Sequence, residues 1–173
     1  YYELTVKLHN ILKEYSGSEK EYLEWVESLK ASTLTAYYTP REVVQAITTT
    51  LWDAMPAARV LDPAAGKGAF LLTPSTCEGC ERFVAYEKDL LTGLILSAKY
   101  GHYRRGDIRV AGFETIPASE LGRYDLVATN VPFGDIRVFD PDYTNSKSQV
   151  RRDAAKMIHR YYVLKGLDCL REG

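Results

Sequence analysis

Four short runs of apolar residues alternate with segments of helical periodicity, and this alternation constrains the fold of the 173-residue chain more than any other feature. Each run is apolar on both faces and has turn-forming residues near its ends, which is typical of strands that are covered on both sides. The runs begin at Arg59, Arg82, Ile108 and Tyr124. Helical patterns at 90–100 and 151–170 follow the second and fourth runs. The pattern predicts an α/β fold with a mostly parallel sheet.

A helical extension is expected in front of these runs. Apolar residues recur at helical spacing over 4–15 and 19–30, and Ser16-Gly17-Ser18 joins the two segments. We therefore predict an N-terminal helical extension at 1–34 and a second unit at 35–173.

A third helix is expected at the start of the second unit. Thr39 is a suitable N-cap, and Pro40 then occupies the first helical position, where its missing N–H costs nothing. The apolar pattern from Arg41 continues to about Ala54, where this helix should end.

Charge and composition restrict the class of protein. The formal net charge of −1 gives no global reason to bind nucleic acid, so a DNA partner would require a local basic patch or further segments. No apolar run has the length of a membrane span, and the first residues do not resemble a signal peptide. The odd number of cysteines, three, fits a reducing compartment. We therefore expect a cytoplasmic protein without a membrane partner.

In an open parallel sheet, ligands bind outside the carboxyl ends of the strands. The first run is followed by Asp62-Pro-Ala-Ala-Gly-Lys-Gly, in which Gly66 and Gly68 allow a tight bend and a close approach of backbone to ligand. The spacing of these glycines differs from that of a phosphate-binding loop. Glu87 follows the second run, where a carboxylate can accept hydrogen bonds from ribose hydroxyls.

The segment after the third run offers groups for an adenine ring. Phe113 could pack on the face of the ring, and Glu114 could accept a hydrogen bond from its amino group. Asp107, in front of this run, is a second candidate for the latter role, which we rank lower.

The segment after the fourth run, Asn130-Val-Pro-Phe, is the most informative about chemistry. An aromatic amine is a poor nucleophile because its lone pair is delocalised into the ring. The side-chain oxygen of Asn130 and the main-chain carbonyl of Val131 could accept hydrogen bonds from the two N–H groups of the amine and favour a pyramidal nitrogen. Pro132 stiffens the turn, and Phe133 offers a ring for stacking. Such a site works by positioning and hydrogen bonding and requires no metal.

Taken together, four segments resemble, in order and spacing, the motif series of the N6-adenine DNA methyltransferases. They are Tyr37-Tyr-Thr-Pro, the Asp62 segment, Glu87 and Asn130-Val-Pro-Phe. The form Asn-Val-Pro-Phe-Gly-Asp is similar to the branch found on plasmids and conjugative elements, which is often joined to helicase segments. The resemblance covers roughly 35–173. It implies a Rossmann-like methyltransferase fold, S-adenosylmethionine as the cofactor, DNA as the partner and a restriction-modification type of setting.

The resemblance also implies residue roles. The methionine end of the cofactor would be held by Tyr38, Thr39 and Pro40, and its amino acid and sulfur would lie on the loop of Asp62, Ala64, Gly66 and Gly68. Glu87 would bind the ribose, while Phe113 and Glu114 would form the adenine pocket. The catalytic motif would be Asn130, Val131, Pro132 and Phe133. Val131 stands where most members have proline, an exchange that should be tolerated because this position acts through its carbonyl.

The resemblance leaves the extent and the target open. The sheet of the family continues beyond a helix ending near Leu170, so we expect a C-terminally incomplete domain, an exposed edge at the fourth strand and a part of a longer protein. The same arrangement of two acceptors could also orient the N4 amine of cytosine or the side-chain amide of glutamine for methylation, so these targets remain alternatives. A non-catalytic scaffold in a DNA-modification or helicase protein is a further alternative.

Two other features are weaker. Cys77 and Cys80 form a Cys-x-x-Cys without a second pair of ligands, so no metal site is predicted. Arg152, Lys156 and Arg160 would share one face of a helix that follows the catalytic motif. This face either follows a DNA backbone or is simply solvated.

Overall fold

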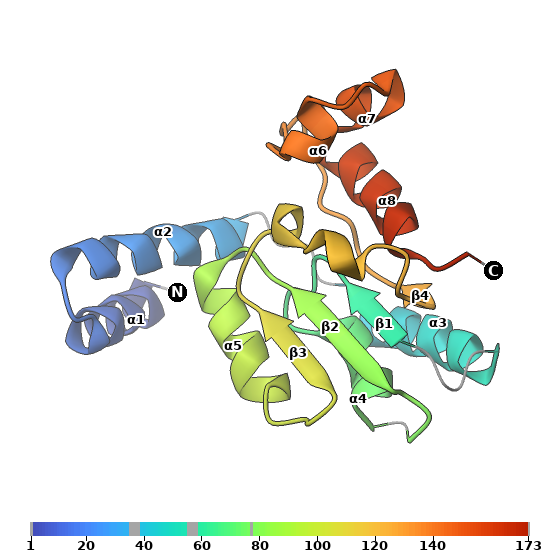
Figure 1. Cartoon of the computed structure of the whole chain (residues 1–173). Helices are drawn as coiled ribbons and strands as arrows, with labels where there is room; N and C mark the ends of the chain where they lie inside the picture. The colour runs from blue at the N-terminus through green and yellow to red at the C-terminus, as the bar shows by residue number, and fades with distance from the viewer. Residues whose placement is uncertain (1, 35–38, 55–58, 77, 173) are drawn as a thin grey trace.

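The computed structural model describes residues 2–34, 39–54, 59–76 and 78–172, and the structural statements that follow concern these residues. Its centre is a parallel sheet with the strand order β3-β2-β1-β4 (Figure 1). The strands are β1 (Arg59–Asp62), β2 (Arg82–Tyr86), β3 (Gly106–Arg109) and β4 (Leu126–Val127). The predicted α/β fold with a parallel sheet is therefore confirmed.

Successive side chains of a strand point to opposite faces, and this sheet is covered on both. On one face, Val60, Phe83 and Ala85 pack against Leu96 and Tyr100. These last two belong to α5 (Leu90–Tyr100), while η1 (Ala69–Leu71) and α4 (Leu72–Thr76) lead from β1 towards β2.

The other face is packed mainly by aromatic rings. Leu61, Val84 and Tyr86 form a buried cluster with Phe113 and Tyr161. Phe113 belongs to η2 (Phe113–Thr115), and Tyr161 to α8 (Ile158–Cys169). The apolar character of the strands on both faces is explained by these two layers.

The two N-terminal helices are α1 (Tyr2–Tyr15) and α2 (Glu19–Leu34), which confirms the two helices predicted in the extension. Helix α2 is linked to the sheet domain through α5. The hydroxyl of Ser28 donates to Asp89 at 2.5 Å and accepts from the amide of Leu91 at 3.0 Å. Asp89 is itself the N-cap of α5 and accepts from the amide of Thr92 at 2.8 Å. None of the described helices has the length and apolarity that a membrane span needs.

Helix α3 (Arg41–Ala54) ends where the sequence predicts, but its start differs by one residue. The carbonyl of Pro40 accepts the amide of Val44 at 3.1 Å, so Pro40 stands at the cap position expected for Thr39.

The prediction of a single helix at 151–170 is wrong. The chain forms α6 (Pro141–Thr144), α7 (Gln149–Ala154) and α8, with a break before Ile158. At the break the carbonyl of Ala155 accepts the amide of Val138 at 2.9 Å, and Met157 is extended. The carbonyl of Ala155 is thus bonded to a segment outside the helix, whereas a continuous α-helix would bond it to an amide of its own next turn.

Two strand boundaries also differ. Strand β3 begins at Gly106, two residues earlier than predicted, because Gly106 pairs with Phe83 of β2. Strand β4 is shorter than predicted, and its edge is not fully exposed: Tyr124 forms a parallel bridge with Leu170, and its carbonyl accepts the amide of Arg171 at 2.9 Å. The segment after α8 therefore covers the edge at the start of β4.

Candidate active site

The predicted ligand-binding residues lie at the carboxyl ends of the four strands. Asp62 is the last residue of β1, Glu87 follows β2, Glu114 follows β3 and Asn130 follows β4. Backbone hydrogen bonds hold these ends together. The amide of Glu87 donates to Arg109 at 3.0 Å, and the amide of Ala128 donates to Leu61 at 3.0 Å.

Glu87 connects the loop after β1 to the end of β2. Its Oε2 accepts the amide of Gly66 at 2.8 Å, and its Oε1 accepts the amide of Asp89 at 2.8 Å. Burial raises the pKa of Glu87, against the lowering effect of these two amides. Since each carboxylate oxygen has two acceptor positions, each can still accept a hydroxyl of a ribose.

Asp62 is fully buried beneath the same loop. Burial raises its pKa to about 7, opposed by the Thr129 hydroxyl and the Ala64 amide and assisted by the negative charge of Glu87. Its Oδ1 accepts the Ala64 amide at 3.3 Å, whereas its Oδ2 has no hydrogen-bond partner among the described residues. A buried carboxylate oxygen with spare acceptor capacity fits a positively charged ligand in the loop above it.

The two loop glycines have the left-handed backbone that glycine favours, with φ values of 53° at Gly66 and 78° at Gly68. A Cβ at Gly68 would lie 2.3 Å from the ring of Tyr100 and 2.7 Å from Leu96. The hydroxyl of Tyr100 donates to the carbonyl of Gly68 at 2.8 Å. Helix α5 therefore packs directly against this loop and sets its shape.

Of the other residues expected to hold the methionine end of the cofactor, the structure describes all but one. Tyr38 lies outside the described residues. Thr39 is half-buried, Pro40 is exposed just before α3, and Ala64 is half-buried beside the aromatic cluster.

Phe113 and Glu114 have different environments. Phe113 is fully buried, and its ring contacts those of Tyr86, Tyr161 and Tyr162 at centroid distances of 5.9, 6.2 and 5.3 Å. In this structure its ring belongs to the core and is not open to an adenine. Glu114 lies nearer the surface and forms an ion pair with Lys88 at 2.8 Å.

Asp107 is held away from the ligand edge. It lies within β3 and forms ion pairs with Arg82 at 2.6 Å and Arg109 at 2.7 Å. The hydrogen bond from Arg109 is the largest effect that lowers the pKa of Asp107. Of the two acids considered for the adenine pocket, Glu114 is the one at the carboxyl end of β3.

The Asn130 segment forms an irregular loop after β4. Asn130 is exposed, Val131 and Pro132 are half-buried, and the ring of Phe133 is 70% exposed. Val131 packs against the aromatic cluster, so the loop has an anchored start and an open aromatic tip.

The far end of this loop is fixed by buried polar groups. The carboxylate of Asp140 accepts hydrogen bonds from Lys165 and, at 2.6 Å, from the hydroxyl of Tyr161. Asp140 and Lys165 are 2% and 4% exposed. Burial opposes the ionised form of Asp140, but Lys165 and Tyr161 together hold its pKa below the ordinary value. Helix α8 therefore holds the chain that leaves the Asn130 loop.

Tyr162 of α8 packs beside the predicted adenine pocket, a position that the sequence did not predict. It is buried, and burial raises its pKa, with further contributions from the charges of Glu114, Glu87 and Asp62. Its ring centroid lies 5.3 Å from that of Phe113, the residue before Glu114. No local motif marks it, because its position depends on the packing of α8.

Other predicted features are not assembled into a site. Cys77 lies outside the described residues, and Cys80 is buried beside β2. The expected basic face is wrong because Lys156 lies in the break between α7 and α8. Instead, Lys156 pairs with Asp153 at 2.7 Å, and Arg152 donates to the carbonyl of Ser146.

The parallel sheet with the order β3-β2-β1-β4 defines a Rossmann-like fold, and the comparisons below place it among the methyltransferase folds. The family model described as "N-6 DNA Methylase" matches residues 21–83, which span α2, α3, β1 and the start of β2. This match covers less than half of the chain and includes Asp62 and both loop glycines.

Comparison with solved structures gives the same fold. A protein of Pyrococcus horikoshii, provisionally assigned as an RNA methyltransferase, is 18% identical with a TM-score of 0.53, covering 95% of this chain and 69% of that one. Trm5 of Methanocaldococcus jannaschii, in complex with adenosine, is 14% identical with a TM-score of 0.50, covering 81% of this chain and 35% of that one. The chain thus spans about a third of Trm5. No curated protein sequence matched the chain.

Together, the fold and the family match support S-adenosylmethionine as the cofactor. The acids and glycines at the carboxyl edge are residues that could hold it, because Asp62 and Glu87 offer acceptor oxygens and Gly66 and Gly68 let the backbone approach a ligand closely.

Proposed function

We propose that this chain is the cofactor-binding and catalytic part of an S-adenosylmethionine-dependent methyltransferase that modifies the N6 amino group of adenine in DNA. The observation that carries the proposal is the Asn130-Val-Pro-Phe loop, which follows β4 at the same sheet edge as Asp62 and Glu87. The N-6 DNA Methylase match supports the methyltransferase class and favours an exocyclic amine as the target.

The cofactor-binding roles follow from position. Glu87 accepts the ribose hydroxyls, because its two oxygens stand at the end of β2 and already orient the loop through Gly66. Asp62 supports the loop from below, and a cationic ligand would favour its ionised form. Glu114 belongs to η2, whose Phe113 packs against Tyr162 of α8, and we assign the adenine end to Glu114 and Tyr162. Tyr38, Thr39 and Pro40 complete the methionine end.

The catalytic roles belong to the loop after β4. When bound, S-adenosylmethionine supplies a methyl group already activated by its positively charged sulfur. The Asn130 side-chain oxygen and the Val131 carbonyl accept hydrogen bonds from the two N–H groups of the target amine and make its lone pair available. The amine nitrogen would form its bond to the methyl carbon as the carbon–sulfur bond breaks, with S-adenosylhomocysteine as the leaving group, and would then lose one proton to solvent. Pro132 restricts the backbone, and the exposed ring of Phe133 stacks on the target base after the base leaves the duplex.

The test is methyl transfer from labelled S-adenosylmethionine to oligonucleotides, comparing Asn130→Ala with Asn10→Ala. Removal of one hydrogen-bonding group at a reacting centre costs about 10² to 10³ in rate. We expect Asn130→Ala to lose transfer by that factor while it still binds cofactor. Asn10 is exposed on α1, so its variant should match the parent chain.

Product analysis identifies the target. N6-methyladenine in DNA supports the proposal, whereas N4-methylcytosine, a methylated RNA or methylglutamine would assign the same site to another substrate. Equal transfer by Asn130→Ala and the parent chain would contradict the catalytic role. Cofactor binding by a chain that methylates none of these targets would favour the non-catalytic scaffold.

A further inference from the structure

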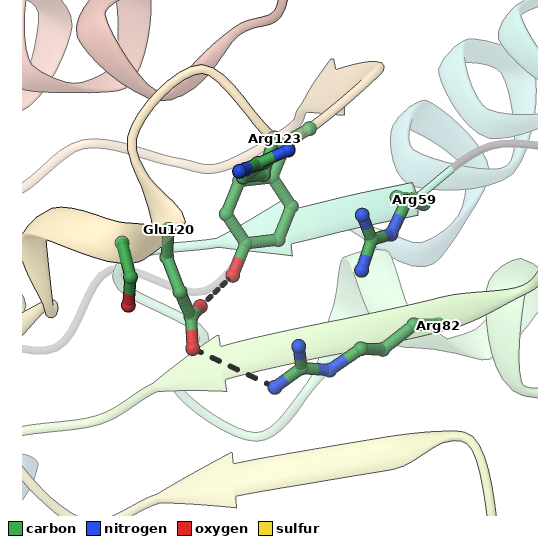
Figure 2. A pocket seen from close by; sticks show the side chains of 6 residues that line it. Arg59, Arg82, Glu120 and Arg123 are labelled. Atoms are coloured by element: carbon green, nitrogen blue, oxygen red, sulfur yellow. Dashed lines mark hydrogen bonds and ion pairs between the residues drawn. The ribbon is translucent and has the colours of Figure 1, made fainter.

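Three arginines surround a small pocket at the amino ends of the strands. Arg59 and Arg82 are the first residues of β1 and β2 and stand opposite each other in register, while Arg123 precedes β4. With Ser119, Glu120 and Tyr124 they line a pocket of about 200 Å³. Figure 2 shows the three guanidinium groups around this pocket, with Arg82 directed toward Glu120.

This pocket is separate from the proposed cofactor site. Strand β1 runs from Arg59 at the pocket to Asp62 at the carboxyl edge. At roughly 3.3 Å per residue, these strand ends lie about 10 Å apart. A ligand in the pocket would therefore leave the cofactor loop accessible.

The two acids near the pocket are already neutralised. Glu120 accepts from Arg109 at 2.5 Å and from the hydroxyl of Tyr124, and it lies 3.6 Å from Arg82. Asp107 pairs with both Arg82 and Arg109. Two carboxylates thus balance two guanidinium groups. Although burial opposes ionisation of Glu120, these partners hold its pKa below the ordinary value, so it stays charged and fixed.

Arg59 and Arg123 remain as an excess of two positive charges. Neither side chain forms an ion pair within the described part of the chain. The neighbouring acid, Asp125, is engaged elsewhere: one oxygen accepts the backbone amide of Arg59 at 2.6 Å, and the other pairs with Arg171 at 2.6 Å.

We propose that this pocket binds a phosphate group. Guanidinium groups present planar pairs of N–H donors that match the oxygens of a phosphate, and the excess of two charges matches a phosphate dianion. Arg59 and Arg123 supply the uncompensated charge, and Arg82 is held in place by Glu120 and Asp107. Glu120 limits the site, because it repels an anion that enters too deeply. The inference does not depend on the proposed methyl transfer.

Calorimetric titration of the chain with sodium phosphate tests the proposal, with sodium chloride keeping the ionic strength constant. Arg59→Gln and Arg123→Gln each remove one of the two excess charges, and Arg104→Gln is the control because Arg104 is exposed outside the pocket. We expect saturable binding that weakens at least tenfold in both pocket variants and is unchanged in the control. Circular dichroism in sodium chloride verifies that each variant is folded.

A competition experiment distinguishes two sources of phosphate. If a short DNA duplex displaces inorganic phosphate and binds less tightly to Arg123→Gln, the pocket takes a phosphate of a nucleic-acid backbone. If phosphate binds in the pocket and the duplex does not compete, the ligand is a free phosphate or a small phosphomonoester. Both results support a phosphate site. Absence of saturable phosphate binding, or binding by the folded Arg59→Gln and Arg123→Gln variants that is as tight as binding by the parent chain, would overturn it.

Discussion

Asp62 is a residue whose ionisation is strongly altered by the fold. Its side chain is fully buried, and its pKa is raised from 3.8 to about 7. Between these two values, the unfolded chain loses the proton of Asp62 while the folded chain keeps it. The free energy of unfolding therefore falls as the pH rises from about 4 to about 7.

Asp62→Asn should remove this dependence, because the amide carries no charge in either state. We compare the free energies of unfolding of the variant and the parent chain at each pH. From pH 5 to pH 8, the difference between them, variant minus parent, should increase by about 2 kcal/mol. Urea unfolding at several pH values measures the difference. Parallel stability profiles for the two proteins would show that Asp62 ionises normally in the fold.

Phe113 and Glu114 show what could be predicted about single residues. Their position after the third strand follows from the order of the motifs, and Glu114 does lie at the ligand edge. The burial of Phe113 could not be predicted, because it depends on the tyrosines of α8, which are far away in the sequence. Tyr162 was missed for the same reason.

At the scale of elements, the contact of α5 with the loop after β1 decides the shape of the cofactor site. Gly68 combines a left-handed backbone with a very close approach to Tyr100 and Leu96. A methyl group there would strain the backbone and push α5 away from the loop.

Gly68→Ala should therefore destabilise the chain by about 2 to 5 kcal/mol, from backbone strain plus overpacking. Gly122→Ala is the matched control. Gly122 has a φ of 66°, but the nearest atom to its added Cβ is 4.0 Å away, so only the backbone strain of about 1 to 2 kcal/mol applies. Thermal unfolding compares the two variants. Equal losses would mean that the packing of α5 on Gly68 contributes nothing.

The predicted elements succeed where local pattern decides them. The first strand and the helix Leu90–Tyr100 have the predicted bounds, since an apolar run marks the strand and a helical pattern marks the helix in the sequence. The prediction of one continuous helix after the Asn130 loop fails because the helix is interrupted by a long-range contact. The amide of Val138, which lies outside the helix, donates a hydrogen bond to the carbonyl of Ala155.

On the scale of the whole molecule, the sheet separates two chemical environments. Its carboxyl edge gathers Asp62, Glu87 and Glu114, whereas its amino edge carries Arg59, Arg82 and Arg123. The net charge of −1 conceals this separation, which is why composition gave no reason to expect an anion site. In Figure 1 the strand arrows all run the same way, so the two edges lie at opposite ends of the sheet.

Calorimetric titration with S-adenosylmethionine tests the central claim most directly, because every role assigned to residues of the methyl-transfer site depends on a cofactor at the carboxyl edge. The chain should bind it saturably, and Glu87→Ala should weaken binding at least tenfold by removing the acceptor for the ribose. Glu81→Ala, which changes an exposed acid just before the amino end of β2, should bind like the parent chain. Failure of the folded chain to bind, or equal affinity of Glu87→Ala and the parent chain, would contradict the account.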